Sequence, residues 1–178
     1  LGTHEEEKEK WLVERPMLVS VSHGDLKYAK YPVLAGHFEF DAILTTELAI
    51  DHQLGGELTR LHGLGLYPGP IGSNQIVLNE NLNKSSFKGG VIVGLGVPGE
   101  LSGFALMNSV EKGVARYLTI KKDQSISEGD GDNSATNGIS VITIANAYGG
   151  LPTESSIRAI ILGIQQANKN IHSVYKGK

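Results

Sequence analysis

Hydrophobic and polar residues along the chain follow two different periods, and segments with one period alternate with segments of the other. Short segments in which apolar residues alternate or run together are typical of β-strands and occupy residues 17–22, 33–38, 75–79, 90–95 and 139–146. Segments with the helical period occupy residues 3–15, 41–56, 57–62, 102–122 and 154–171. Strands that alternate with long helices form a largely parallel sheet covered on both faces. The pattern therefore predicts a three-layer α/β/α fold.

The three longest predicted helices each carry an apolar face and a defined start or end. The helix at 102–122 begins at the N-cap Ser102 and has one stripe of Leu106, Val110, Val114, Tyr117 and Leu118. The helix at 154–171 follows the predicted cap Thr153, with a core face of Ile157, Ile160, Ile161 and Ile164. The helix at 41–56 has an apolar side of Ile43, Leu44, Leu48, Ala49 and Leu54.

The remaining segments are predicted to be irregular. Residues 63–74 hold four glycines and two prolines and cannot form a regular element. Residues 123–138 have the lowest complexity in the chain, which indicates a flexible insertion. Residues 173–178 are typical of a strand that is just beginning.

Composition narrows the functional classes. A length of 178 residues suits a single domain, 1–178, and because the first residue is Leu1 we expect a fragment of a longer protein. The formal net charge of −3 and the lack of a basic stripe argue against nucleic-acid binding. The absence of cysteine removes disulfides, thiolate metal sites and a cysteine nucleophile together. Without a membrane-length apolar run or a signal peptide, we expect a cytoplasmic protein that does not contact membranes.

The segment Gly94-Leu95-Gly96-Val97-Pro98-Gly99 has the spelling of a dinucleotide-binding fingerprint. In that fingerprint the helix begins within the glycines, whereas Pro98 and Gly99 interrupt this position. An acidic residue is also expected about 20 residues later, at the end of the next strand. The next predicted strand is much farther on, and Asn146 follows it. The spelling thus favours a tight strand-to-helix turn, with a dinucleotide site as the alternative.

Other polar groups allow two interpretations each. His37, Glu39 and Asp41 would share one face of an extended strand, where they could hold a divalent cation or simply form a polar face. His23 and Asp25 follow a predicted strand, where they could act in catalysis or form an Asx turn. We assign no metal site, no catalytic residue and no cofactor on these patterns.

Four tyrosines lie in predicted loops that contain glycine or proline, namely Tyr28, Tyr31, Tyr67 and Tyr148. Tyrosine rings on loops can form a binding surface, and they can equally cover a core. No serine lies in the G-x-S-x-G sequence of a nucleophile elbow, which is a further reason to assign no catalytic residue.

Two longer stretches resemble known families. "GVIVGLGVPGELSGFALMNSVEKGVARYL" resembles the N-terminal, non-catalytic domain of leucine aminopeptidases, which implies a macro-domain-like α/β/α fold. "VSHGDLKYAKYPVLAGHFEFDAI", "LGLYPGPIG" and "VIVGLGVPGEL" together are similar to a module of large bacterial proteins that also carry caspase-like CHAT peptidase domains. This second resemblance covers most of residues 17–165 and implies a companion module for sensing or assembly. A peptidase of that kind needs a Cys–His pair, so it would lie outside this cysteine-free chain.

The parallel sheet gives a prediction for where a ligand would bind. Loops 23–31, 94–101 and 146–152 would each follow a strand and meet at one rim. Two of them precede helix N-termini, whose amides favour an anionic ligand or a carboxylate of a partner. The predicted binding residues are Gly94, Gly96, Gly99, Ser102, His23, Lys27, Tyr28, Lys30, Tyr148, Gly149 and Thr153.

Two functions remain open on these grounds. The first is a non-catalytic module that senses a ligand or binds other domains of the same polypeptide or a partner protein. The alternative is an enzyme that binds a nucleotide or nucleotide derivative through the glycine-rich loop 94–99. A detached aminopeptidase fragment is poorly supported, because the sequence shows no cluster of metal-binding Asp, Glu and Lys.

Overall fold

The computed structural model of the chain describes residues 17–79, 85–127, 137–145 and 150–176. Its elements are, in order, η1 Leu26–Tyr28, β1 Val33–His37, α2 Thr45–Gln53, α3 Glu57–Gly63, β2 Asn74–Leu78, β3 Gly89–Gly94, α4 Gly103–Ser127, β4 Ser140–Val141 and α5 Thr153–Lys176. The predicted helix at 3–15 lies outside the described residues, as does most of the predicted insertion at 123–138. The start of that insertion belongs to α4, which continues to Ser127.

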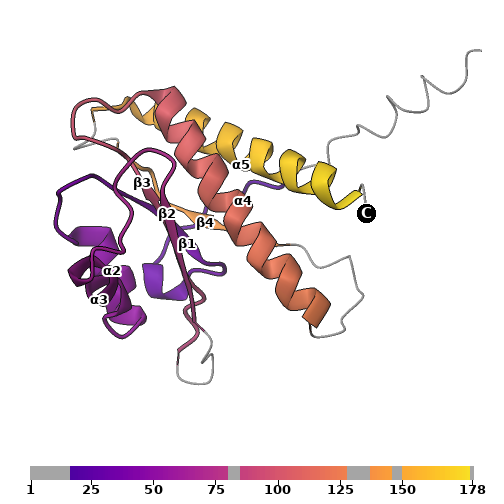
Figure 1. Ribbon diagram of the computed structural model, residues 1–178, viewed down its shortest axis with the longest axis horizontal. Helices are drawn as coiled ribbons and strands as arrows, with labels where there is room; N and C mark the ends of the chain where they lie inside the picture. The colour runs from indigo at the N-terminus through magenta and orange to yellow at the C-terminus, as the bar shows by residue number, and fades with distance from the viewer. Residues whose placement is uncertain (1–16, 80–84, 128–136, 146–149, 177–178) are drawn as a thin grey trace, which may run out of the picture.

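The four strands form one mixed sheet in the order β2-β3-β1-β4. β1 runs parallel to β3, with Val33 opposite Gly90 and His37 opposite Gly94, and it also runs parallel to β4. β2 pairs with β3 in the antiparallel sense. Figure 1 shows α2 and α3 on one face of this sheet and α4 and α5 on the other. The predicted three-layer α/β/α fold with a largely parallel sheet is therefore confirmed.

Alternating side chains of the central strands supply two cores. Leu34, Val91 and Val93 face α4 and α5, whereas Val33, Ala35 and Ile92 face α2 and α3. Every residue of β3 is buried, as expected for a parallel strand that is covered on both faces. The predicted stripe on α4 lies in the first of these cores, with Leu106 and Val110 completely buried.

The strand predicted at residues 17–22 does not form. No regular element includes these residues, and Leu18 and Val21 are 93% and 99% exposed. A strand needs a neighbour to bond its backbone, and within the described part of the chain the segment has none. The predicted strand at 139–146 is shortened to β4 at the edge of the sheet, although Ile144 beyond it is buried.

Two helices bury faces that match the predictions only in part: Ile43 and Leu54 of the first predicted face, and Ile160 and Ile164 of the second, do pack against the cores. On α2 the buried residues are Glu47, Ile50 and Asp51, while Leu48 and Ala49 are exposed. On α5 the buried residues are mostly small, namely Ser156, Ala159, Ile160, Gly163 and Ala167, while Ile157 is 43% exposed. Residues 173–176, predicted to start a strand, continue α5. In both helices the contacts made by neighbouring elements decide the buried face, and apolar periodicity alone does not reveal them.

Candidate functional site

The carboxyl ends of β1, β3 and β4 lie at one edge of the sheet, where open α/β sheets place their ligand sites. The turn before β2 reaches the same edge because β2 is antiparallel. Backbone bonds hold three connections together there: Glu39 N donates to Gly96 O at 2.9 Å, and Gly96 N donates to Gly69 O at 2.7 Å. We refer to the connections 38–45, 66–73 and 94–102, together with residues 142–145 after β4, as the carboxyl edge.

Each glycine of the segment 94–99 has a local reason to be glycine. A Cβ on Gly94 would lie 2.2 Å from Pro70 O, so the turn before β2 could not approach β3. Gly96 and Gly99 have φ values of 71° and 86°, in the left-handed region that side chains disfavour. A Cβ on Gly99 would meet no atom within 4 Å, so this position opens outward. The eight-residue connection from Gly94 to α4 also departs from the dinucleotide fingerprint, in which the helix begins within the motif.

The start of α4 is capped as predicted. Ser102 Oγ accepts a bond from Ala105 N at 3.1 Å, and Ser102 O accepts the first helical bond from Leu106 N at 3.0 Å. Within the described residues, no hydrogen bond uses the amides of Val97, Gly99 or Ser102. These donors, together with the positive end of the helix dipole, form a surface that suits an anion.

Backbone strain is concentrated at the same edge. Among the described residues, the non-glycine residues with positive φ are Phe40, Thr45 and Ala145, at 63°, 45° and 61°. The first two follow β1, and the third follows β4. Phe40 is also 94% exposed, so burial does not compensate for its strain. Residues held in this region without a packing reason often serve ligand binding.

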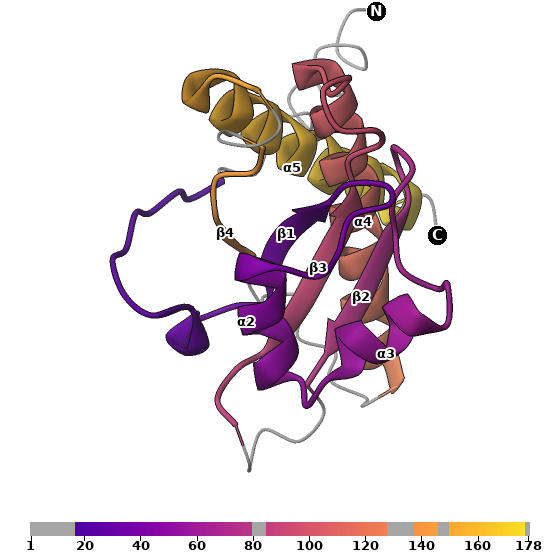
Figure 2. The ribbon, with the colours of Figure 1, turned by 90° about the vertical axis from the view of Figure 1, so that its left-hand side faces the viewer.

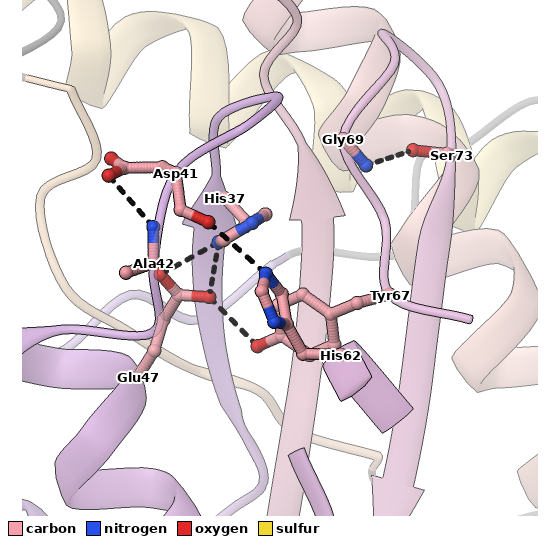
Figure 3. A network of polar contacts seen from close by, with 8 residues as sticks. All are labelled: His37, Asp41, Ala42, Glu47, His62, Tyr67, Gly69 and Ser73. Atoms are coloured by element: carbon pink, nitrogen blue, oxygen red, sulfur yellow. Dashed lines mark hydrogen bonds and ion pairs between the residues drawn. The ribbon is translucent and has the colours of Figure 1, made fainter. Parts of the chain in front are cut away.

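A polar network joins the end of β1 to α2, to Tyr67 and to the backbone at Asp41 (Figure 3). His37 closes β1, and its Nδ1 lies 3.0 Å from Glu47 Oε1, while the Tyr67 hydroxyl donates to the same oxygen at 2.8 Å. Burial, followed by the charge of Glu47, raises the pKa of Tyr67 well above its usual value. The His62 ring packs edge-on against Tyr67, and its Nε2 lies 3.1 Å from Asp41 O. The network fixes α2 and the turn before β2 to the end of β1.

The structure brings part of the predicted ligand set together. Gly94, Gly96, Gly99 and Ser102 lie at the carboxyl edge. Thr153 is the first residue of α5 and is not its cap, because Pro152 O accepts the first helical bond from Ser156 N. Tyr148 and Gly149 lie outside the described residues.

The other predicted ligand residues lie at the opposite end of the sheet. His23, Lys27, Tyr28 and Lys30 precede β1, so they approach its amino end. The prediction of a shared rim was wrong because it required residues 17–22 to be a strand. Here Lys27 lies 3.4 Å from Asp25 and 4.9 Å from the centre of the Tyr28 ring. Whether this second surface binds a ligand stays a prediction.

The sequence patterns missed Phe40 and the Glu47 network. They singled out His37, but with Glu39 and Asp41 on one strand face, and this grouping is wrong because β1 ends at His37 and Phe40 turns the backbone. The described residues hold no group of three His, Cys, Asp or Glu side chains placed to bind a metal ion. Residue type gave no signal for Glu47, because the same helix also carries Asp51, His52 and Gln53.

Within the described residues, no helix is both long enough and apolar enough to cross a membrane. No protein-family model matches the chain, and no curated protein matches it. Among solved structures, the chain is similar to the macrodomain of Mycobacterium tuberculosis DarG, with a TM-score of 0.61 at 14% identity. The match covers 84% of this chain and 91% of that one. At this identity the likeness concerns the fold alone, and the chain has a macrodomain-like α/β/α fold.

Proposed function

We propose that the carboxyl edge binds a nucleotide-derived anion, and that the chain is a binding module for such a ligand. The observation that carries the proposal is that strained non-glycine residues lie at the same edge as amides that have no partner among the described residues. Phe40 and Ala145 hold left-handed backbone at the strand ends, and the amides of Val97, Gly99 and Ser102 in the connection after β3 donate to no described residue.

The chemistry of the edge suits the two parts of such a ligand. Phosphate oxygens would accept bonds from the amides that precede α4, where the helix dipole adds a favourable potential. An exposed phenyl ring provides a flat apolar surface on which a base can stack. Phe40 is 94% exposed, and Phe104, in the first turn of α4, is 74% exposed. The macrodomain-like fold and the position at the strand ends support the same assignment.

We propose binding in place of turnover because the imidazole at the end of β1 is not accessible. His37 is 4% exposed, and its Nδ1 is already engaged by Glu47. The alternative, an enzyme that acts on a nucleotide derivative, would need a proton-transfer group that reaches the ligand.

The experiment is calorimetric titration with ADP, ADP-ribose and adenosine. The two diphosphates should bind saturably and adenosine much more weakly, because it carries no anion. Gly99→Asp should weaken diphosphate binding at least about tenfold, which corresponds to about 1.4 kcal/mol, because it places a carboxylate beside the amides.

Gly55→Asp is the matched control. Gly55 has a φ of 68° and also has no atom within 4 Å of an added Cβ, but it lies at the end of α2. It therefore receives the same charge and similar strain away from the edge, and its affinity should equal that of the wild type. Absence of saturable binding by either diphosphate, or equal losses in the two variants, would contradict the proposal.

A role in sensing is the wider context that we propose for this binding. It is supported by the resemblance of residues 17–165 to the companion module of CHAT-containing bacterial proteins. In that setting, ligand binding here would be transmitted to a caspase-like peptidase domain elsewhere in the same polypeptide or in a partner protein. Sequencing of the full gene and its neighbours tests this context: no encoded domain with a Cys–His pair would argue against it.

A further inference from the structure

The segment 17–22, Met-Leu-Val-Ser-Val-Ser, has the composition and alternation of a strand but no partner in the described chain. Leu18, Val19 and Val21 are 93%, 60% and 99% exposed. β-branched residues are enriched in strands because their side chains pack well against neighbouring strands. Extended apolar segments with free backbone groups readily pair with another sheet edge. The segment therefore has the sequence pattern of a strand but pairs with no strand among the described residues.

β4 provides the complementary feature, because its outer edge pairs with no other strand among the described residues. It pairs with β1 on one side and is the last strand of the sheet on the other. Val141 on this edge strand is 39% exposed. Figure 2 shows the indigo segment before η1 passing on the β4 side of the sheet, without entering it.

The start of α5, which contacts the residues after β4, distinguishes this edge from the opposite one. The bond from the Ser156 hydroxyl to Ile144 O anchors the start of α5 to the residues that follow β4, and Ile160 packs in the same core as Ile144. Beside this anchored face, α5 presents an apolar depression of about 620 Å³ lined by Thr153, Glu154, Ile157, Arg158, Ile161 and Leu162. A strand added to β4 and continued along residues 142–144 would run toward the start of α5, where this apolar depression lies.

We infer that two copies of the chain associate by exchange, with segment 17–22 of each copy adding to the β4 edge of the other. Every copy carries both the segment and the edge, which are unpaired among the described residues, so the contact is self-complementary and closes with twofold symmetry. Val19 and Val21 share one side of the added strand and face Ile157 and Ile161 of α5, and Ser20 and Ser22 occupy the other side. Gly24 precedes η1 with open space around it and serves as the hinge.

The test is the mass of the intact chain in solution, measured by light scattering at about 10–100 μM. The wild type should give twice the chain mass of 19.0 kDa. The donor variant Val19→Asp/Val21→Asp and the acceptor variant Ile157→Asp should both give the monomer mass. All three substituted residues are at least 43% exposed, so each variant should keep its melting temperature and fold.

Leu66→Asp is the control, because it places the same charge on a leucine that is 60% exposed but lies in the turn before β2. It should remain a dimer. An equimolar mixture of the donor and acceptor variants should form a heterodimer with one intact contact, weaker than the wild type. A wild-type monomer at 100 μM, a dimer that survives either substitution, or a mixture that stays monomeric would each overturn the inference.

Discussion

At the scale of single residues, Phe40 shows the conflict between stability and proposed function most clearly. A bulky residue in the left-handed region costs about 1–2 kcal/mol relative to ordinary backbone. Phe40 occupies this region at a φ of 63° and recovers almost nothing by burial, since 94% of it is exposed. The turn itself is held by the bond from Glu39 N to Gly96 O and by the contact of His62 with Asp41 O. The backbone therefore keeps its shape whatever side chain stands at position 40.

This arrangement predicts opposite effects of Phe40→Asn on stability and binding. Asparagine tolerates left-handed backbone better than phenylalanine, so the free energy of unfolding should rise by up to about 1 kcal/mol. Affinity for ADP or ADP-ribose should fall, because the stacking surface is lost. Urea unfolding and calorimetry on the same samples measure both effects. A stability gain with unchanged affinity would remove Phe40 from the proposed site.

At the scale of elements, the two long helices meet through small residues. α5 turns Ser156, Ala159, Gly163 and Ala167 toward the core, which allows its backbone to come close to α4. A Cβ built on Gly163 would lie 2.7 Å from Met107 O and 2.9 Å from Val110 Cβ. Because the first of these is a backbone atom, the helices would have to move apart to accept even one methyl group. Close packing of this kind explains why the larger Ile157 is left on the outside.

Gly163→Ala therefore tests which of two opposing effects is larger. Alanine gains about 1 kcal/mol over glycine within a helix, whereas overpacking typically costs 1–3 kcal/mol. We expect the steric cost to win, with a net loss of unfolding free energy on the order of 1–2 kcal/mol. Gly103→Ala is the control, since Gly103 begins α4 with open space around it, and it should be neutral or stabilising. A stabilised Gly163→Ala variant in urea unfolding would show that the helix contact is looser than this geometry implies.

At the scale of the whole molecule, the three layers of the fold could be predicted from the sequence. The residues that make up the candidate site could be predicted only in part. Buried parallel strands such as β3 are continuous apolar runs, and α4 has a single clear stripe, so local pattern was sufficient for both. The Gly94–Ser102 connection was found because its glycines and its cap are visible as residue types. The strain at Phe40 was not visible, because phenylalanine gives no sign of left-handed backbone. The buried face of α2 depended on His37 and Tyr67, which lie 10 and 20 residues from Glu47 along the chain.

The stability of the whole domain should also decline in strongly alkaline solution, because two tyrosine hydroxyls are buried in the folded chain. Burial raises the pKa of Tyr117 to about 12, and burial together with Glu47 raises that of Tyr67 further. Free tyrosine titrates near pH 10, so below this pH both phenols keep their protons in the folded and the unfolded chain, and stability does not depend on them. Above it the unfolded chain loses protons that the folded chain retains, so unfolding becomes progressively easier up to the folded pKa values.

Urea midpoints measured between pH 8 and 11.5 should therefore be lowest at the alkaline end. Tyr117→Phe removes one of the two phenols together with its bond to Gly138 O at 3.1 Å. The lost bond lowers stability by a similar amount at every pH, by about 0.5–1.5 kcal/mol, whereas the lost phenol reduces the slope above pH 10. The two contributions separate because only the second depends on pH.

Lysines also titrate in this range, but they are identical in the two proteins and cancel in the comparison. An alkaline slope that is the same in Tyr117→Phe and the wild type would mean that the Tyr117 hydroxyl is solvated in the folded chain, and that the contact between α4 and the residues preceding β4 opens readily.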